Sequence, residues 1–237
     1  MEQAAEGVTR FEDQGVVNWY LVETDDGKVA VDTAFPTAWE QVEPHLADLK
    51  AIVITHAHVD HLGFAERARQ ETGVPVYVPQ GDAQLARHPL RYAKSERVPL
   101  LYLRHLPTLR LYWRATKAGA IRGKTLRDLR TYGDGDELPG GLRAVSTPGH
   151  TDGHMALHLP GRDVLFAGDA IVMRDPYTDR EGPCIVARAA TKDSERATRS
   201  LDAIAATGAR TVLTGHGPAW TGGAETAAER ARAAGVA

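Results

Sequence analysis

Cysteine is nearly absent from this sequence, since Cys184 is the only one among 237 residues. A single thiol excludes a framework of disulfides within the chain and any zinc site built on paired cysteines. Long apolar runs are absent as well, because no stretch approaches the ~18 apolar residues that a membrane-spanning helix needs. Residues 1–7 contain neither the basic nor the apolar region of a secretory signal peptide. These absences predict a cytoplasmic protein with no transmembrane segment.

Two common catalytic motifs are also missing. The sequence contains no Gly-X-Ser-X-Gly nucleophile elbow, which argues against a serine hydrolase of that type. It contains no Gly-X4-Gly-Lys-Ser/Thr phosphate loop, so chemistry driven by a nucleotide has no support.

The composition is that of an ordinary folded domain. Hydrophobic residues make up 43% of the chain and charged residues 25%, which provides a core and argues against wholesale disorder. A length of 237 residues allows one large domain or two small ones. Because no low-complexity linker divides the sequence, we predict a single domain over residues 1–237.

The net charge of −3 conceals an uneven distribution. Residues 85–130 contain twelve Lys and Arg but only two acidic residues, so this segment has a net charge of +10 and the remainder has −13. Leucine and aromatic side chains are interleaved with the basic ones at 100–113. The pattern predicts a mostly helical insertion at about 85–130, interrupted at Pro89, Pro99 and Pro107.

Apolar periodicity and turn residues predict strands in two groups, separated and followed by helices. We expect a hairpin of strands 16–22 and 28–32, and further strands at 51–55, 74–78, 142–147, 155–159, 163–167 and 211–214. We expect helices at 37–49, 64–72 and 193–206 and at the C-terminus. This order fits a mixed α/β or α+β domain.

The most specific functional signal is the sequence Thr-His-Ala-His-Val-Asp-His at 55–61, directly after the predicted buried strand 51–55. Neutral imidazole is the commonest metal ligand, and an unpaired cluster of three His and one Asp would be costly to bury. A solvated histidine-rich loop is the alternative. The position of His56, His58, Asp60 and His61 at a strand end favours a metal site.

Three further candidate ligands also follow predicted strands. His150 follows strand 142–147, Asp169 follows strand 163–167, and His216 follows strand 211–214. Glycines flank each of them, which lets the backbone turn sharply or approach an ion closely. Four strand ends that deliver nitrogen or oxygen ligands make a chance arrangement improbable.

These residues resemble the metallo-β-lactamase fold superfamily of hydrolases. The resemblance extends from the hairpin at 16–33 to the Gly-His-Gly at 215–217. It implies an α+β fold, an αββα sandwich of the metallo-β-lactamase type, with the basic helical insertion added to it. Transferred by position, it implies that a first metal ion is bound by His56, His58 and His150, a second by Asp60, His61 and His216, and both by Asp169.

The resemblance also implies a cofactor and a catalytic residue. We expect two divalent metal ions. The all-nitrogen-and-oxygen ligand set is equally consistent with zinc, manganese or iron, and three neutral histidines with an open position favour zinc. Two such ions would generate a bridging hydroxide and polarise the bond under attack. Asp60 would orient that hydroxide and carry its proton to the leaving group.

Supporting roles are implied for two further residues. Asp32 matches an aspartate that supports the site from behind the ligands, although the family usually has Asp-Thr-Gly where this chain has Asp32-Thr33-Ala34. His154 matches a histidine that the family often has without binding metal, and we expect it to form structural hydrogen bonds. Cys184 matches no ligand position and is expected to be a small apolar residue.

The basic insertion favours an anionic small-molecule substrate. Its composition describes an amphipathic lid, with candidate substrate contacts at Tyr102, Tyr112 and Trp113 and at Tyr177 in the 170–190 loop. The alternatives are a solvated basic face and a contact in a homodimer. A nucleic acid is not favoured as a partner, because the remainder of the chain would repel a phosphate backbone.

We therefore expect a metal-dependent hydrolase that cleaves an ester, lactone or thioester of a small acyl substrate. A lactonase of this fold often has Tyr three residues after the bridging Asp, where this chain has Val172. Only 21 residues follow His216, which weakens the case for a glutathione thioesterase. Sulfur dioxygenases with a single iron, phosphodiesterases or nucleases of the same fold, and a metal-binding protein without activity remain as alternatives.

Overall fold

The computed structural model, which describes residues 1–89, 102–120 and 125–237, contains two large β-sheets and a short third one. The first sheet follows the order of the sequence: β1 (Glu2–Ala5), β2 (Val8–Asp13), β3 (Val17–Thr24), β4 (Gly27–Val31), β5 (Leu49–Val53), β6 (Val76–Pro79) and β7 (Arg130–Tyr132). The second has the order β14 (Thr211–Thr214), β11 (Val164–Gly168), β10 (Met155–Leu159), β9 (Leu142–Ser146) and β8 (Glu137–Leu138). The third pairs β12 (Val172–Arg174) with β13 (Glu181–Cys184).

The first sheet changes from antiparallel to parallel along its width. The predicted hairpin is present as β3 and β4, with Tyr20 opposite Val31. From β4 onward the neighbours β5, β6 and β7 are parallel. Parallel neighbours end at the same edge of a sheet. The residues that follow β4 and β5, which include Asp32 and the histidine motif, therefore emerge together.

The second sheet brings its own candidate ligands to one edge. Strands β9, β10 and β11 are antiparallel, whereas β11 and β14 are parallel, with Phe166 opposite Leu213. Asp169 follows β11 and His216 follows β14. Since parallel strands end at the same edge, these two residues also emerge together.

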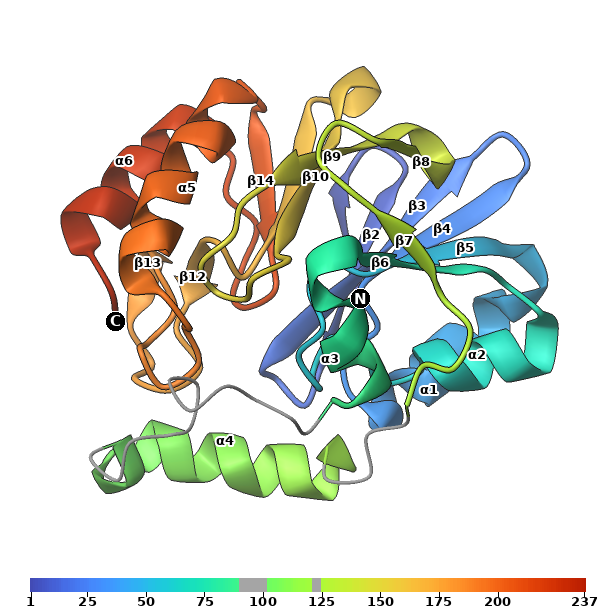
Figure 1. Cartoon of the computed structure of the whole chain (residues 1–237), viewed down its shortest axis with the longest axis horizontal. Helices are drawn as coiled ribbons and strands as arrows, with labels where there is room; N and C mark the ends of the chain where they lie inside the picture. Colours follow the sequence, from blue (N-terminus) through green and yellow to red (C-terminus); the bar gives the residue numbers. More distant parts are fainter. Residues whose placement is uncertain (90–101, 121–124) are drawn as a thin grey trace.

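Helices lie outside the two sheets (Figure 1): α1 (Trp39–Val42), α2 (Ala65–Thr72), α3 (Ala83–Arg87), α4 (Leu106–Lys117), α5 (Ser194–Ala206) and α6 (Ala224–Ala234). Three clusters of buried side chains separate the layers. The first joins β5 to α2 through Ile52 and Ala68, the second joins the two sheets through Val53 and Leu157, and the third includes Leu201 of α5. This arrangement confirms the expected αββα sandwich.

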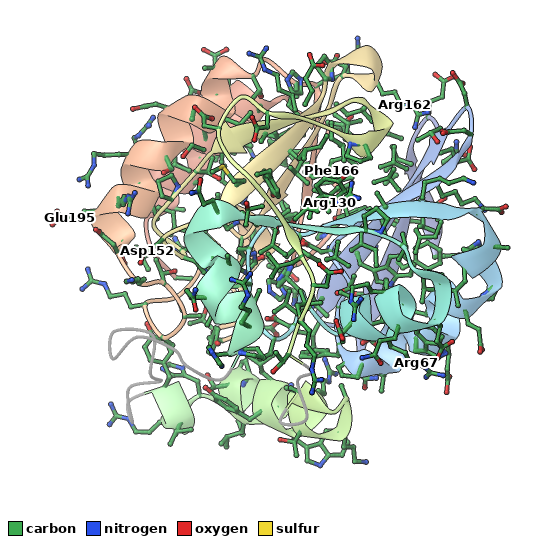
Figure 2. All side chains as sticks on the ribbon, turned by 45° about the vertical axis from the view of Figure 1, so that its right-hand side comes forward. Arg67, Arg130, Asp152, Arg162, Phe166 and Glu195 are labelled. Carbon is green, nitrogen blue, oxygen red and sulfur yellow. The ribbon has the colours of Figure 1, made fainter. Side chains whose placement is uncertain are left out.

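Apolar side chains fill the space between the sheets, and charged ones lie outside it. Figure 2 shows Phe166 in the interior, whereas Arg67 of α2 and Glu195 of α5 point away from it. The ring of Phe166 meets that of Tyr20 edge to face at 5.2 Å between centroids. Burying one such side chain contributes about 1.5–3 kcal/mol.

The predicted helix at 37–49 is not one continuous α-helix. Only Trp39–Val42 is α-helical, between 3-10 turns at Pro36–Ala38 and Glu43–Asp48. Pro44 explains the change, because it lacks the N–H of an α-helical bond and its ring excludes the carbonyl four residues earlier. The prediction of a single helix was wrong here.

The basic insertion contains one long helix among the described residues. Pro107 lies in the first turn of α4, where its missing N–H needs no partner, so it begins the helix and does not interrupt it. Figure 1 shows α4 lying across one end of the sandwich. The parts of the predicted insertion at 90–101 and 121–124 lie outside the described residues.

Across the described ranges, no helix is long and apolar enough to cross a membrane. The assignment of residues 1–237 to a single domain stays a prediction.

Candidate metal centre

Four loops from the two sheets meet at one edge of the sandwich, and each carries candidate ligands. The loop after β5 carries His56, His58, Asp60 and His61. The loops after β9, β11 and β14 carry His150, Asp169 and His216.

The structure brings the seven side chains together in three overlapping groups whose ligand atoms lie within 4.8 Å of one another: His56, His58 and His150; His56, His61 and Asp169; and Asp60, His61 and His216. Six of these side chains are buried, and Asp60 is 21% exposed. The first and third groups contain the same residues as the two sets that the resemblance implied, and the second group joins them through His56, His61 and Asp169. The assignment of these residues as metal ligands stays a prediction.

Asp169 lies between the first and last groups. Its Oδ2 is 3.5 Å from His150 Nε2 and 3.2 Å from His216 Nε2. Its Oδ1 is 3.6 Å from His61 Nε2. His150 Nε2 is also 2.9 Å from His58 Nδ1. One carboxylate thus faces imidazole nitrogens on both sides.

The donor atoms fit a divalent cation. His56 Nε2, His61 Nε2 and Asp169 Oδ1 are buried, and none has a hydrogen-bond partner in the described part of the chain. A buried polar atom without a partner costs about 1–3 kcal/mol. Since three such atoms converge within one small volume, a bound cation would remove that cost at once. Imidazole nitrogen and carboxylate oxygen suit zinc, manganese and iron.

The electrostatics also favour positive charge at one side of the centre. Burial alone would raise the pKa of Asp169, but His216 and His61 outweigh it and hold that pKa well below its usual value. Burial would lower the pKa of His61, whereas Asp32, Asp169 and Asp60 raise it to about 10. The negative charge of the three carboxylates around His61 therefore favours a positive charge at this position.

At the other side of the centre the rings remain neutral. Burial lowers the pKa of His56 and of His150 well below the usual value, and neighbouring imidazoles lower both further. Neutral imidazole is the form that binds a metal ion. These two rings are thus ready to coordinate without releasing a proton.

Asp32 contacts one ring directly and a second one through Thr55. Its Oδ2 is 2.9 Å from His61 Nδ1, which fixes that ring with Nε2 toward the centre. Asp32 also accepts hydrogen bonds from the backbone N–H and the hydroxyl of Thr55. The Thr55 hydroxyl in turn lies 3.1 Å from His56 Nδ1.

The turn after Asp32 explains why glycine is usual there in the resembled family. Ala34 adopts φ +45°, in the left-handed region that favours glycine. The same turn packs against Gly63, where a Cβ atom would lie 2.1 Å from the carbonyl carbon of Phe35. The chain therefore keeps the turn despite its alanine.

His154 forms a hydrogen bond through each of its ring nitrogens. Its Nε2 accepts the backbone N–H of Asp169 at 3.0 Å, so its proton is on Nδ1, which donates to the hydroxyl of Thr147 at 2.8 Å. Burial lowers its pKa to about 3. Both nitrogens are used, and the ring helps to position Asp169.

Sequence patterns gave no indication of the residues that hold the His216 loop. His216 Nδ1 donates to the carbonyl of Val16 at 2.7 Å, which leaves Nε2 toward the centre. Asn18 donates to the carbonyls of Thr214 and Gly217, at 2.9 and 2.7 Å. These contacts connect the start of β3 to residues far along the chain, so no local pattern could reveal them.

Asp82 is a second supporting residue that sequence reasoning missed. It is buried and accepts three hydrogen bonds, from the backbone N–H of Ala57 at 3.0 Å, the hydroxyl of Thr151 at 2.7 Å and the backbone N–H of Gly153 at 2.8 Å. It thereby joins the loop of His56 and His58 to the loop of His150.

The four aromatic residues predicted to contact substrate are divided between two places. Tyr102 and Tyr177 lie 6.4 Å apart between ring centroids, near the start of α4. Tyr112 and Trp113 are exposed on α4, Trp113 by 59%, with the Lys117 ammonium over its ring. Their role as substrate contacts stays a prediction.

Comparison with known proteins gives consistent matches over most of the chain. Residues 13–216 match the family described as the metallo-beta-lactamase superfamily. A Bacillus subtilis protein described as the probable metallo-hydrolase YflN is 29% identical over 193 residues, which are 73% of this chain and 66% of that protein. The N-acyl homoserine lactonase AttM of Rhizobium radiobacter is 28% identical over 209 residues, which are 86% of this chain and 69% of that protein.

A solved structure supports the same fold. The metallo-beta-lactamase family protein TTHA1429 from Thermus thermophilus matches with a TM-score of 0.69 and 26% identity, over 97% of this chain and 79% of that one. The alignments span 66%, 63% and 52% of the first three curated relatives. The activity and substrates of the whole protein are therefore matters of proposal.

Proposed function

Because the chain belongs to the metallo-beta-lactamase superfamily, we propose that it is a metal-dependent hydrolase that cleaves an ester, lactone or thioester bond of a small acyl substrate. The observation that carries the proposal is the convergence of seven candidate nitrogen and oxygen ligands from four loops, six of them buried. The names of its relatives YflN and AttM are in keeping with a hydrolase and with a lactone among the candidate bonds.

We propose two divalent metal ions, with zinc as the first candidate. His56, His58 and His150 would hold one ion, Asp60, His61 and His216 would hold the other, and Asp169 would contact both. Bound ions of this kind lower the pKa of water and polarise the carbonyl that is attacked. The chain itself has to supply orientation, proton transfer and a fixed arrangement of the rings.

Asp60 is the residue best placed to move a proton. Its Oδ2 lies 3.6 Å from His216 Nε2 and 3.9 Å from His61 Nε2, and it is the only partly exposed member of the cluster in the described residues. A carboxylate that faces both the centre and solvent can orient an attacking water, accept its proton and deliver it to the leaving group. We assign Asp60 as the catalytic acid and base on this geometry.

The first experiment combines metal analysis with a substrate panel. The panel contains an aryl ester, a lactone, an acyl thioester and a phosphodiester, each offered to zinc-, manganese- and iron-loaded protein. We expect about two metal ions per chain and turnover of at least one carboxylic ester, lactone or thioester. One iron per chain without hydrolysis would favour the dioxygenase alternative, and turnover of the phosphodiester alone would contradict the proposed bond class.

The second experiment tests Asp60 directly. The Asp60→Asn variant should lose roughly 10²–10⁴-fold in kcat, the usual contribution of general acid–base catalysis, and the loss should persist in preparations reloaded to full metal content. Asp128→Asn is the matched control, since that side chain is 86% exposed. Wild-type turnover in a fully metal-loaded Asp60→Asn variant would refute the assignment.

A further inference from the structure

A cavity of about 220 Å³ lies next to the His216 loop, beneath α4. Its walls come from the turn between β2 and β3, from one side of α4, from the segment after β12 and from the residues that follow His216. Pockets that hold a whole drug-sized ligand measure about 300–1,000 Å³. This one is large enough for one end of a small substrate.

Arginine dominates the charge of this cavity. Four guanidinium groups line it, and two carboxylates, Glu12 and Asp179, oppose them, which leaves a net charge of +2. The arginines are Arg10, Arg110, Arg114 and Arg174.

Two of the four arginines already have structural partners. Arg10 donates to the carbonyl of Gly217 at 2.9 Å and pairs with Glu2 at 2.9 Å. Arg174 pairs with Asp179 through Nε at 2.5 Å. Both hold the walls of the cavity together.

The two arginines on α4 remain available. The side chain of Arg114 has a single long hydrogen bond, 3.4 Å to the carbonyl of Gly15, and the side chain of Arg110 forms no hydrogen bond or ion pair within the described ranges. They are four residues apart and thus one helical turn from each other on the same side of α4. The hydrogen bond from Arg174 lowers the pKa of Asp179, and the charges of Arg110 and Arg114 lower it further, which places their charge at the cavity.

The contacts of α4 hold this side of the helix over the cavity. The hydroxyl of Thr108 donates to the carbonyl of Tyr177 at 2.8 Å, and Leu111 is buried between the two arginines. Leu111 and Pro107 also contribute apolar surface to the lining. The cavity thus combines a cationic rim with a short apolar wall.

The cavity is adjacent to the metal centre. Val16, whose carbonyl accepts the Nδ1–H of His216, lines it, and so does Gly217. None of the seven candidate ligands lines the cavity, but two of its lining residues, Val16 and Gly217, flank His216, so the cavity lies beside the loop that carries this candidate ligand.

We propose that this cavity binds the oxyanion of an anionic acyl substrate, with the carboxylate or phosphate held by Arg110 and Arg114. Guanidinium groups bind both oxyanions through paired N–H donors, and a short hydrocarbon chain along Leu111 would connect the anion to the bond at the metal centre. The proposal deepens the proposed hydrolase function and rests on it for the identity of the ligand as a substrate.

The kinetic test compares two aryl esters of equal acyl length, the pentanoate and the glutarate monoester, which differ in a terminal carboxylate. The Arg110→Gln/Arg114→Gln double variant should raise KM for the glutarate ester roughly tenfold for each lost arginine, with KM for the pentanoate ester and both kcat values unchanged. Arg104→Gln is the matched control, an exposed arginine of the same basic segment outside the cavity lining. Equal effects on both esters, or the same effect from Arg104→Gln, would overturn the proposal.

A binding measurement separates failure of the cavity from failure of the proposed function. Titration calorimetry with glutarate and with inorganic phosphate, on the metal-loaded full chain, identifies which oxyanion the cavity takes. Binding of either that is lost in the double variant and kept in Arg104→Gln supports the cavity, even if no ester is hydrolysed and the hydrolase proposal fails. If the double variant still binds the oxyanion, or if the wild-type protein binds neither, the proposal that the cavity binds an oxyanion is wrong. Hydrolysis of neutral esters would still be expected in that case.

Discussion

Replacing Asp82 should weaken the metal centre although this residue contacts no candidate ligand. Its carboxylate accepts hydrogen bonds from Ala57, Thr151 and Gly153, and these come from two loops on different sheets. Both loops carry histidines that face the centre. Loss of the carboxylate should therefore change stability and metal affinity together.

The magnitude follows from the donors that would be left without an acceptor. In Asp82→Ala two buried backbone N–H groups lose their partner, each at a cost of about 1–3 kcal/mol, in addition to the lost charge-assisted bonds; we expect about 3–5 kcal/mol in total. In Asp82→Asn the amide oxygen at the Oδ2 position can still accept from Ala57 and Thr151, but the amide N–H₂ then faces the backbone N–H of Gly153. We expect that variant to lose about 2 kcal/mol and roughly 10–100-fold in metal affinity.

The assay is denaturant unfolding of the metal-free protein, followed by metal titration against a competing chelator. Asp152→Asn is the control, since Asp152 belongs to the same loop as Thr151 but is 52% exposed and pairs with Lys192 at the surface. Such a pair contributes at most about 1 kcal/mol. If Asp82→Asn and Asp152→Asn unfold within about 0.5 kcal/mol of each other and bind metal equally, the role assigned to Asp82 is wrong.

Three further predictions concern the stability of the fold and of the metal-bound protein. Burial would raise the pKa of Glu66, but hydrogen bonds from Arg69 lower it below 4.5. Glu66→Gln should therefore destabilise the protein above about pH 5, and the difference in unfolding free energy should vanish as the pH falls through the folded-state pKa of Glu66. A difference that does not depend on pH would contradict this. Gly63→Ala should lower the free energy of unfolding by about 2–4 kcal/mol or prevent folding, because the added Cβ would lie 2.1 Å from the backbone of Phe35. Gly161→Ala is the control and should leave Tm unchanged, because there is open space around Gly161. Equal Tm values for the two variants would disprove the clash. Removing metal with a chelator should lower Tm by roughly 5–10 °C relative to protein at a hundredfold excess over Kd, and an unchanged Tm would argue against a metal bound by the folded state.

The candidate ligands could be predicted from sequence because each one lies in the loop that follows a strand. A strand fixes the backbone, and its end determines where the next few side chains emerge. The motif at 55–61 also gathers four of the seven ligands within a single loop. Local order therefore carried most of the information about the cluster, and the family resemblance supplied its division into two groups.

The supporting residues could not be found in the same way, because their function depends on contacts between distant segments. Asp82 lies in an ordinary Gln-Gly-Asp and becomes important only where residues 57 and 151–153 approach it. The sequence also did not indicate which side of α4 faces the cavity. Aromatic residues of the basic segment are the predicted substrate contacts, and the lining of the cavity adds Arg110 and Arg114.

Strand β2 was missed as well, and for a related reason. Its apolar residues are few and interrupted, and it is stabilised by pairing with β3 over the whole length Val8–Asp13. That pairing is what places the turn before Val16 next to His216. A weak local pattern can thus still produce a strand when its partner is strong.

Four imidazoles at the centre are held in the same way, by a contact between their Nδ1 atom and the protein behind the ring. This arrangement determines how substitutions should change the metal affinity of the site. In each ring one nitrogen faces the cluster while the Nδ1 contacts the surrounding protein: His61 meets Asp32, His56 meets Thr55, His216 meets the carbonyl of Val16, and His150 lies 3.5 Å from the hydroxyl of Thr191. A ring held in this way keeps its tautomer and orientation without help from a metal ion. Metal binding then requires little reorganisation of the rings. Substitutions behind the rings should therefore reduce metal affinity modestly, because they loosen an already formed site, whereas substitution of a metal-facing histidine should reduce that affinity much more.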